Sequence, residues 1–164
     1  MFKFARKCIK SFVGISIVIA LTITSVIPAF AAETTGASSN VQILSGDLQV
    51  VDVTNNNIET KGSLSGYRSM NIQGSGSASF IVDVNGSWSP WAGCTLKTSG
   101  FSSNTTIDVQ VCYGNDVKCS KRLGPNSEVK NIAMLNVSPG GYTIKFTVNG
   151  NASNNTGNLT VWIY

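Results

Sequence analysis

The chain has 164 residues, with 12 basic and 8 acidic side chains, no histidine and a formal net charge of +4 at pH 7. The lack of histidine excludes Ser-His-Asp and Cys-His catalytic sites and the usual zinc ligand sets. The sequence also contains neither a Walker loop nor a dinucleotide-binding fingerprint.

Residues 1–31 have the composition of a bacterial secretory signal peptide. Four cations within 3–10 precede an apolar stretch over 12–27, and Ala-Phe-Ala at 29–31 is a small-residue cleavage signal. We therefore expect cleavage before Ala32 and a secreted, extracellular protein without a stable membrane anchor. The alternative is an uncleaved anchor, because 11–32 is uncharged and long enough to span a bilayer.

Cleavage changes the charge balance. It removes four of the twelve cations, and the remaining eight equal the eight acidic residues, which gives a net charge of zero. Nucleic-acid binding normally needs a domain-wide basic excess, so no nucleic-acid partner is expected. Residues 32–40 are small and polar and predict a flexible lead-in. Residues 41–164 then have a normal length for a single domain.

Alternating apolar and polar residues predict short strands in this domain and no amphipathic helix. We expect strands at 48–53, 67–73, 78–84, 94–98, 128–135, 142–148 and 158–164, and a hairpin over 105–119. Turn-forming residues separate these segments, which predicts an all-β fold, an antiparallel β-sandwich (jelly-roll or Ig-like) of seven to eight short strands.

Three segments depart from the simple alternation. Residues 61–66 are rich in glycine and serine and predict a loop. The sequence SWSPWAGC at 87–94 contains a proline between two tryptophans and also predicts a loop. Residues 128–135 fit no clean period, which predicts a bulged strand.

The hairpin over 105–119 contains two of the three cysteines that remain after cleavage. A turn at 114–116 brings Cys119 back towards Cys112, and cross-strand neighbours lie within disulfide reach. We therefore expect a Cys112–Cys119 disulfide, with Cys94–Cys112 as the rival pairing. In the first case Cys94 is a free thiol or links two chains in a disulfide-bonded dimer.

Candidate catalytic groups are few, and we expect no enzyme. The acidic residues are scattered singly, mostly at outward strand positions or turns, which is typical of surface charge. A nucleophilic thiol needs a cation or base nearby, and Cys94 has only Lys97 close in sequence. Asparagine-rich loops offer oxygen atoms to calcium but match no EF-hand spacing, so neither a metal nor a cofactor is predicted.

Aromatic residues are the best candidates for ligand binding. Trp88 and Trp91 flank Pro90, and they either present flat apolar faces to a ligand or plug one end of the sandwich. Trp162 and Tyr164 alternate to the side opposite the apolar residues of the last strand, so they form either an exposed strip or part of the core. We expect hydrogen-bonding neighbours among three polar side chains, Asp108, Gln110 and Asn158.

The hairpin SPGGYTIKFTV at 138–148 and the strand after it are similar to the last strands of pre-peptidase C-terminal and carbohydrate-binding modules. The similarity covers only this end of the chain, and no family is assigned. The leading hypothesis is a secreted, non-enzymatic β-sandwich module that binds extracellular or cell-envelope glycan. The alternatives are an assembly subunit that pairs through an odd cysteine or an edge strand, and a membrane-active toxin or antimicrobial protein.

Overall fold

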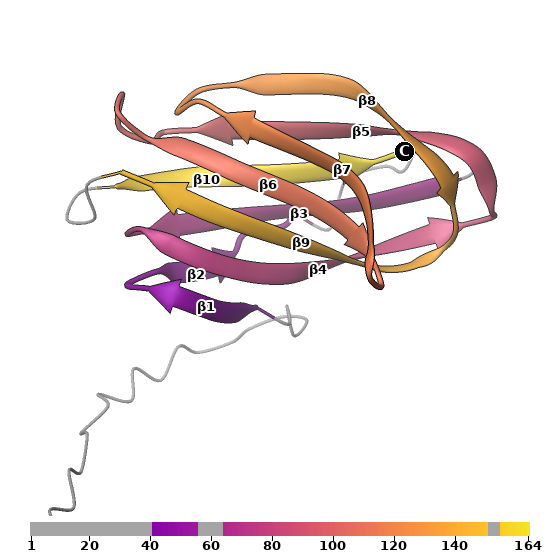
Figure 1. The fold of residues 1–164 in the computed structure, drawn as a ribbon, viewed down its shortest axis with the longest axis horizontal. Coiled ribbons are helices and arrows are strands. Elements are labelled where there is room, and N and C mark those ends of the chain that lie inside the picture. Colours follow the sequence, from indigo (N-terminus) through magenta and orange to yellow (C-terminus); the bar gives the residue numbers. More distant parts are fainter. Residues whose placement is uncertain (1–40, 56–63, 151–154) are drawn as a thin grey trace, which may run out of the picture. The chain divides into compact units, whose positions relative to one another are not determined.

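The computed structural model describes residues 41–55, 64–150 and 155–164, and these residues form antiparallel strands (Figure 1). In chain order the strands are β1 (Gln42–Gly46), β2 (Gln49–Asp52), β3 (Leu64–Gln73), β4 (Gly76–Gly86), β5 (Ser89–Ser99), β6 (Thr106–Tyr113), β7 (Asp116–Leu123), β8 (Glu128–Val137), β9 (Gly140–Asn149) and β10 (Thr156–Ile163). Within these ranges no helix is long and apolar enough to cross a bilayer. The predicted signal peptide and lead-in lie outside the described residues.

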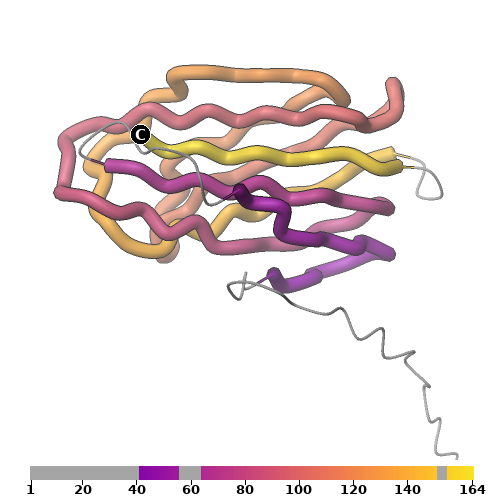
Figure 2. The backbone as a smooth tube through the Cα atoms, turned by 180° about the vertical axis from the view of Figure 1, so that it is seen from behind, coloured from indigo at the N-terminus to yellow at the C-terminus, as the bar shows by residue number. Residues whose placement is uncertain are grey.

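The strands form two layers that face each other. Sheet A has the order β7-β6-β9-β4-β1, and sheet B has the order β2-β3-β10-β5-β8. The two sheets are joined at one corner, where Leu64 and Ser65 of β3 pair with Gly86 and Asn85 of β4. Figure 2 shows sheet B in front, with β10 in yellow between β5 and β3. The predicted all-β sandwich is therefore confirmed.

The core lies between the two sheets, and the alternation in the sequence places it there. In β9 the alternate residues Tyr142, Ile144, Phe146 and Val148 are all buried, as the period of two predicts. Leu159, Val161 and Ile163 of β10 are buried in the same way and face them from sheet B. Burial of these apolar side chains is the main stabilising term of the fold.

Two predicted loops are partly strand. Residues 64–66 of the predicted Gly/Ser loop begin β3, while 61–63 lie outside the described residues. The tryptophan segment joins β5 from Ser89 onward, because Ser89 and Trp91 pair with Val137 and Leu135 of β8. Pro90 has no N–H to donate, and no partner is assigned to it in the ladder. The described residues thus contain ten strands, more than the seven to eight that the sequence predicts.

The predicted bulge in β8 is confirmed. Cys94 and Leu96 of β5 pair with Ile132 and Val129, so β8 carries one extra residue between these two pairs. Asn131 in this bulge has a φ of 55°, in the left-handed region that asparagine tolerates better than most residues. The bulge therefore changes which side chains of β8 face outward.

A second bulge separates the two cysteines of the hairpin. Cys112 pairs with Val117, whereas Val111 pairs with Cys119, so β7 has one extra residue at Lys118. Cys119 shares the face of Val111 and packs against the core, while Cys112 lies on the opposite face of the sheet. The predicted Cys112–Cys119 disulfide is accordingly absent, and both side chains are free thiols.

Cys94 is also a free thiol, but it does not lie where a second chain can reach it. Its side chain points from β5 into the core and is completely buried. A disulfide between two chains through Cys94, as the sequence analysis suggested, would require the sandwich to open. The burial therefore removes the structural basis for that dimer.

Candidate functional site

The outer face of sheet B carries most of the candidate binding residues. Because side chains alternate along a strand, the neighbours of the buried residues in β10 point away from the core. Trp162 and Thr160 therefore lie outward, and Asn158 follows on the same side. Of the two alternatives for Trp162 and Tyr164, the structure shows the partly exposed one, since neither residue belongs to the buried core.

Four aromatic side chains from three adjacent strands lie at one end of this face. Trp162 of β10 pairs in register with Tyr67 of β3, and its ring centroid is 4.7 Å from that of Tyr164. Trp91 of β5 lies two residues from Gly93, which pairs with Tyr164 through two backbone hydrogen bonds of 2.7 and 2.9 Å. We call Tyr67, Trp162, Tyr164 and Trp91 the aromatic row.

Tyr164 is held firmly in the aromatic row. A Cβ added at Gly93 would lie 2.7 Å from the Cε2 atom of Tyr164, so the ring covers the glycine closely. Its hydroxyl donates a hydrogen bond of 2.6 Å to Oδ1 of Asn131 in the β8 bulge and lies 3.2 Å from the Thr95 hydroxyl. The ring and the hydroxyl of Tyr164 are therefore held in place by Gly93 and by the β8 bulge.

Trp91 is the most exposed member of the aromatic row, at 65%. Leu135, its register partner on β8, is 66% exposed and widens the apolar surface beside it. Trp88, which lies between β4 and β5, is also exposed, at 60%. The structure therefore excludes the alternative in which Trp88 and Trp91 plug the end of the sandwich.

Sequence reasoning missed Tyr67, although a signal for it was present. The alternation in the predicted strand 67–73 puts Met70 and Ile72 inward, and Tyr67 has the opposite parity. The missing information was that β3 pairs with β10, which places Tyr67 beside Trp162.

The other end of the face carries amide and hydroxyl groups. The Asn158 amide nitrogen donates to the Ser69 hydroxyl at 3.0 Å and to Oδ1 of Asn71 at 3.2 Å. The Thr160 hydroxyl donates to Oδ1 of Asn158 at 2.8 Å. We call Ser69, Asn71, Asn158 and Thr160 the amide cluster. Its members hold one another in fixed orientations on β3 and β10.

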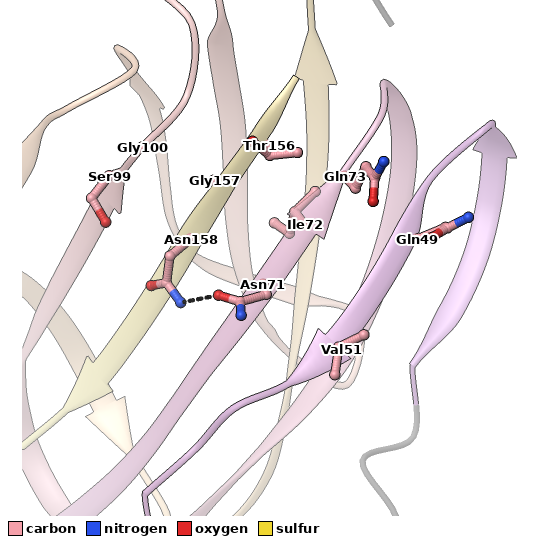
Figure 3. Close-up of a pocket in the computed structure, with 10 residues that line it drawn as sticks. All are labelled: Gln49, Val51, Asn71, Ile72, Gln73, Ser99, Gly100, Thr156, Gly157 and Asn158. Carbon is pink, nitrogen blue, oxygen red and sulfur yellow. Dashed lines mark hydrogen bonds between the residues drawn. The ribbon is translucent and has the colours of Figure 1, made fainter. Parts of the chain in front are cut away.

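A shallow depression of about 510 Å³ lies beside the amide cluster (Figure 3). Figure 3 shows Asn71 and Asn158 turned toward each other, with Gln73 and Thr156 further along the same two strands. The depression is lined by Gln49, Val51, Asn71, Ile72, Gln73, Ser99, Gly100, Thr156, Gly157 and Asn158. None of these residues carries a charge.

Charged residues lie at the β5–β8 side of this surface. Lys97 is exposed opposite Thr160 and pairs in register with Glu128, the first residue of β8. Glu128 in turn forms an ion pair of 3.3 Å with Lys130. Within the described residues no group of three or more histidine, cysteine or acidic side chains is placed to hold a metal ion.

Asp108 and Gln110 do not belong to this surface, which corrects the expectation that they neighbour the tryptophans. Both lie on β6 in sheet A, on the other side of the sandwich from Asn158. Asp108 accepts hydrogen bonds of 2.6 and 3.0 Å from Arg122 and one of 3.1 Å from Asn149. The Arg122 hydrogen bond holds the pKa of Asp108 below its usual value.

Among known proteins, similarity to this chain is found in solved structures. No model of a protein family and no curated protein matches the chain. Among solved structures, the chain is similar to TmCBM61 in complex with beta-1,4-galactotriose, at 17% identity and a TM-score of 0.44, over 76% of this chain and 88% of that chain. A family 35 carbohydrate binding module from Clostridium thermocellum has 18% identity and a TM-score of 0.38, over 76% of this chain and 98% of that chain. The carbohydrate-binding module CBM36 in complex with calcium and xylotriose has 11% identity and a TM-score of 0.33, over 71% of this chain and 98% of that chain. These solved structures are β-sandwich carbohydrate-binding modules, and at such low identity and TM-scores they leave the function of this chain to be derived from its own surface.

Proposed function

We propose that the outer face of sheet B binds a glycan outside the cell, and that the protein catalyses no reaction on it. The observation that carries this proposal is the aromatic row beside an uncharged depression. Both lie on one face, and the seven residues from Asn158 to Tyr164 extend over about 20 Å of strand. This length suits several consecutive sugars of a polysaccharide better than a single monosaccharide.

The aromatic row and the amide cluster both have chemistry that suits a sugar chain. The flat faces of Trp91 and its neighbours offer apolar surface to the C–H faces of sugar rings, with little side-chain entropy to lose. The amides and hydroxyls around Asn158 can both donate to and accept from sugar hydroxyls. Because the lining of the depression is uncharged, a neutral polysaccharide suits it better than an acidic one.

The non-enzymatic part of the proposal follows from where the acidic groups lie. Asp108 is held by Arg122 on sheet A, and Asp52 forms an ion pair of 3.0 Å with Arg68. Neither carboxylate belongs to the aromatic row or to the amide cluster. Glycoside hydrolysis ordinarily needs two carboxyl groups that flank one bond. Export is part of the proposal as well, because the sequence predicts a signal peptide and envelope polysaccharides lie outside the cell.

Binding is tested by titrating the purified protein with a panel of soluble neutral and acidic polysaccharides, while tryptophan emission and acrylamide quenching are recorded. We expect one or more neutral polysaccharides to shift the emission and to protect it from the quencher. Trp91→Ala should weaken that binding at least about tenfold, equivalent to about 1.4 kcal/mol, because buried aromatic anchors dominate binding energies.

Two control variants locate the site on the molecule. Gln110→Ala changes an exposed polar residue of sheet A and should leave binding unchanged. Trp88→Ala tests the remaining sequence prediction, that the loop between β4 and β5 also contacts the ligand. Wild-type affinity in Trp91→Ala, or loss of binding in Gln110→Ala with the fold intact, would contradict a site on sheet B.

A further inference from the structure

Cys94 and Cys119 belong to different sheets and both face the core. Cys94 lies on β5 of sheet B, is completely buried and is a member of the apolar core. Cys119 lies on β7 of sheet A, shares the inward face of Val111 and packs against the same core. Their positions are independent of the glycan site, which lies on the outer face of sheet B.

The two thiols meet on the side of the sandwich where the edge strands β7 and β8 run close together. Cys94 pairs in register with Ile132 of β8, and β8 contacts β7. Lys118, the neighbour of Cys119, donates to the carbonyl oxygens of Leu135 and Asn136, which places Cys119 beside the part of β8 that pairs with residues 91–94 of β5. A hydrogen bond between the two thiols, together with burial, raises the pKa of Cys94 far above its usual value, and the same hydrogen bond lowers the pKa of Cys119.

We propose that Cys94 and Cys119 form a disulfide that joins sheet B to sheet A when the chain meets a disulfide oxidant such as oxidised glutathione. Cys112 is not a competitor, because it lies on the opposite face of β6 from the core residue Val111. The bulge at Lys118 is what turns Cys119 inward. The structure thus selects one of the three possible pairings among these cysteines.

The exchange balances as two displacement steps. The Cys119 thiolate, which is only partly buried, attacks one sulfur of oxidised glutathione and releases one glutathione thiolate. The Cys94 thiol gives its proton to that thiolate, and its sulfur then displaces the second glutathione from Cys119. Two protein S–H bonds are replaced by one S–S bond, and one oxidised glutathione becomes two reduced glutathiones.

Peptide mapping tests the pairing directly. Trypsin cleaves after lysine and arginine, which places Cys8, Cys94, Cys112 and Cys119 in the separate peptides 8–10, 69–97, 98–118 and 119–121. The full chain is refolded with oxidised and reduced glutathione, remaining thiols are alkylated, and the digest is analysed by mass spectrometry without reductant. We expect 69–97 linked to 119–121, about 2 Da lighter than the sum of the two peptides, and alkylated 98–118. Linkage of 98–118 to either partner, or alkylation of all three peptides, overturns the proposal.

Thermal unfolding provides a second test with matched variants. A cross-link between residues 94 and 119 restricts the unfolded chain, so reductant should lower the melting temperature by about 10 °C. Cys112→Ala should keep this difference, and Cys119→Ser should abolish it. Cys119→Ser is preferred to a change at Cys94 because Cys119 is only partly buried. A reductant effect that persists in Cys119→Ser, or disappears in Cys112→Ala, contradicts the Cys94–Cys119 bond.

Discussion

Tyr164 shows how a single residue can be oriented before any ligand arrives. Its backbone pairs with Gly93, its hydroxyl donates to Asn131, and its ring lies beside Trp162. Each contact removes a degree of freedom that binding would otherwise have to restrict. The orientation depends on the absence of a side chain at Gly93, because the ring occupies that space.

Gly93→Ala should therefore weaken glycan binding by displacing the Tyr164 ring. The added Cβ would stand 2.7 Å from Cε2, a distance that forces the ring to move and the hydroxyl to leave Asn131. We expect a loss of about 1 kcal/mol in unfolding free energy from the hydrogen bond, and a several-fold loss of affinity. Calorimetric titration and denaturant unfolding measure the two effects.

Tyr164→Phe is the matched control for the ring position. It removes the same hydrogen bond to Asn131 but leaves an aromatic ring of the same shape above Gly93. Stability should fall by a similar amount, while most of the affinity should remain. If Gly93→Ala binds as tightly as the wild type, the position of the Tyr164 ring does not matter for binding.

The sequence alone could not decide how exposed the tryptophans are. The alternation in β10 correctly separates Trp162 from Leu159, Val161 and Ile163. The face of β10 that carries Trp162 meets solvent only if no further layer covers it. The alternation along one strand does not indicate whether such a layer exists. Trp88 and Trp91 posed the same problem, because a loop aromatic can turn inward or outward with equal local geometry.

At the level of elements, Asp108 connects three strands of sheet A. It lies on β6, accepts two hydrogen bonds from Arg122 on β7, and accepts one from Asn149 at the end of β9. The Arg122 hydrogen bond lowers the pKa of Asp108 in the folded protein. Since the unfolded carboxyl titrates near pH 4, this contribution to stability is present above that pH and is lost as the pH falls through the lower folded pKa.

Asp108→Asn should consequently reduce the acid sensitivity of the protein. The Asp108 side chain is 38% exposed and its partner Arg122 is 71% exposed, so solvent screening limits the contribution to at most about 1 kcal/mol. Urea unfolding at pH 7 and at pH 2.5 should show a smaller difference for Asp108→Asn than for the wild type. Asp47→Asn, at a carboxyl for which the structure has no ion pair among the described residues, serves as the control. An unchanged pH difference in Asp108→Asn would show that the pair does not couple to folding.

A bulge explains why the sequence predicts the wrong cysteine pairing in the hairpin. The hairpin 105–119 is present as predicted, and its turn at Gly114 and Asn115 is where the sequence places it. One extra residue at Lys118 nevertheless moves Cys119 to the other face of β7. Such a bulge leaves no mark in the apolar pattern of an exposed edge strand, whose residues from Asp116 to Lys121 are mostly polar.

For the whole molecule, β10 is the strand on which sheet B depends. It pairs with β3 on one side and with β5 on the other, although both lie more than fifty residues earlier in the chain. Sheets built from such distant partners fold slowly, because much chain entropy is lost before the contacts form. The sequence predicts the strands themselves, but their alternation contains no information on which strands are neighbours.

Deletion of residues 156–164 should therefore abolish cooperative folding. It would remove the strand that joins β3 to β5 and expose the core residues opposite Leu159 and Val161. Deletion of 42–46, which removes β1, should leave a folded protein, since that strand is exposed along its whole length and, among the described strands, pairs only with β4. Far-UV circular dichroism during heating distinguishes the two outcomes. A cooperative transition in the variant without β10 would contradict this account of sheet B.

The corner between β3 and β4 also makes the two long sides of the sandwich mechanically unequal. At that corner the layers share backbone pairing through Leu64 and Ser65. On the opposite side, the Lys118 ammonium of β7 donates to the carbonyl oxygens of Leu135 and Asn136 in β8, at 3.4 and 3.3 Å. Separation of the layers would thus break backbone hydrogen bonds at the β3–β4 corner, and would break the hydrogen bonds of the flexible Lys118 side chain on the opposite side.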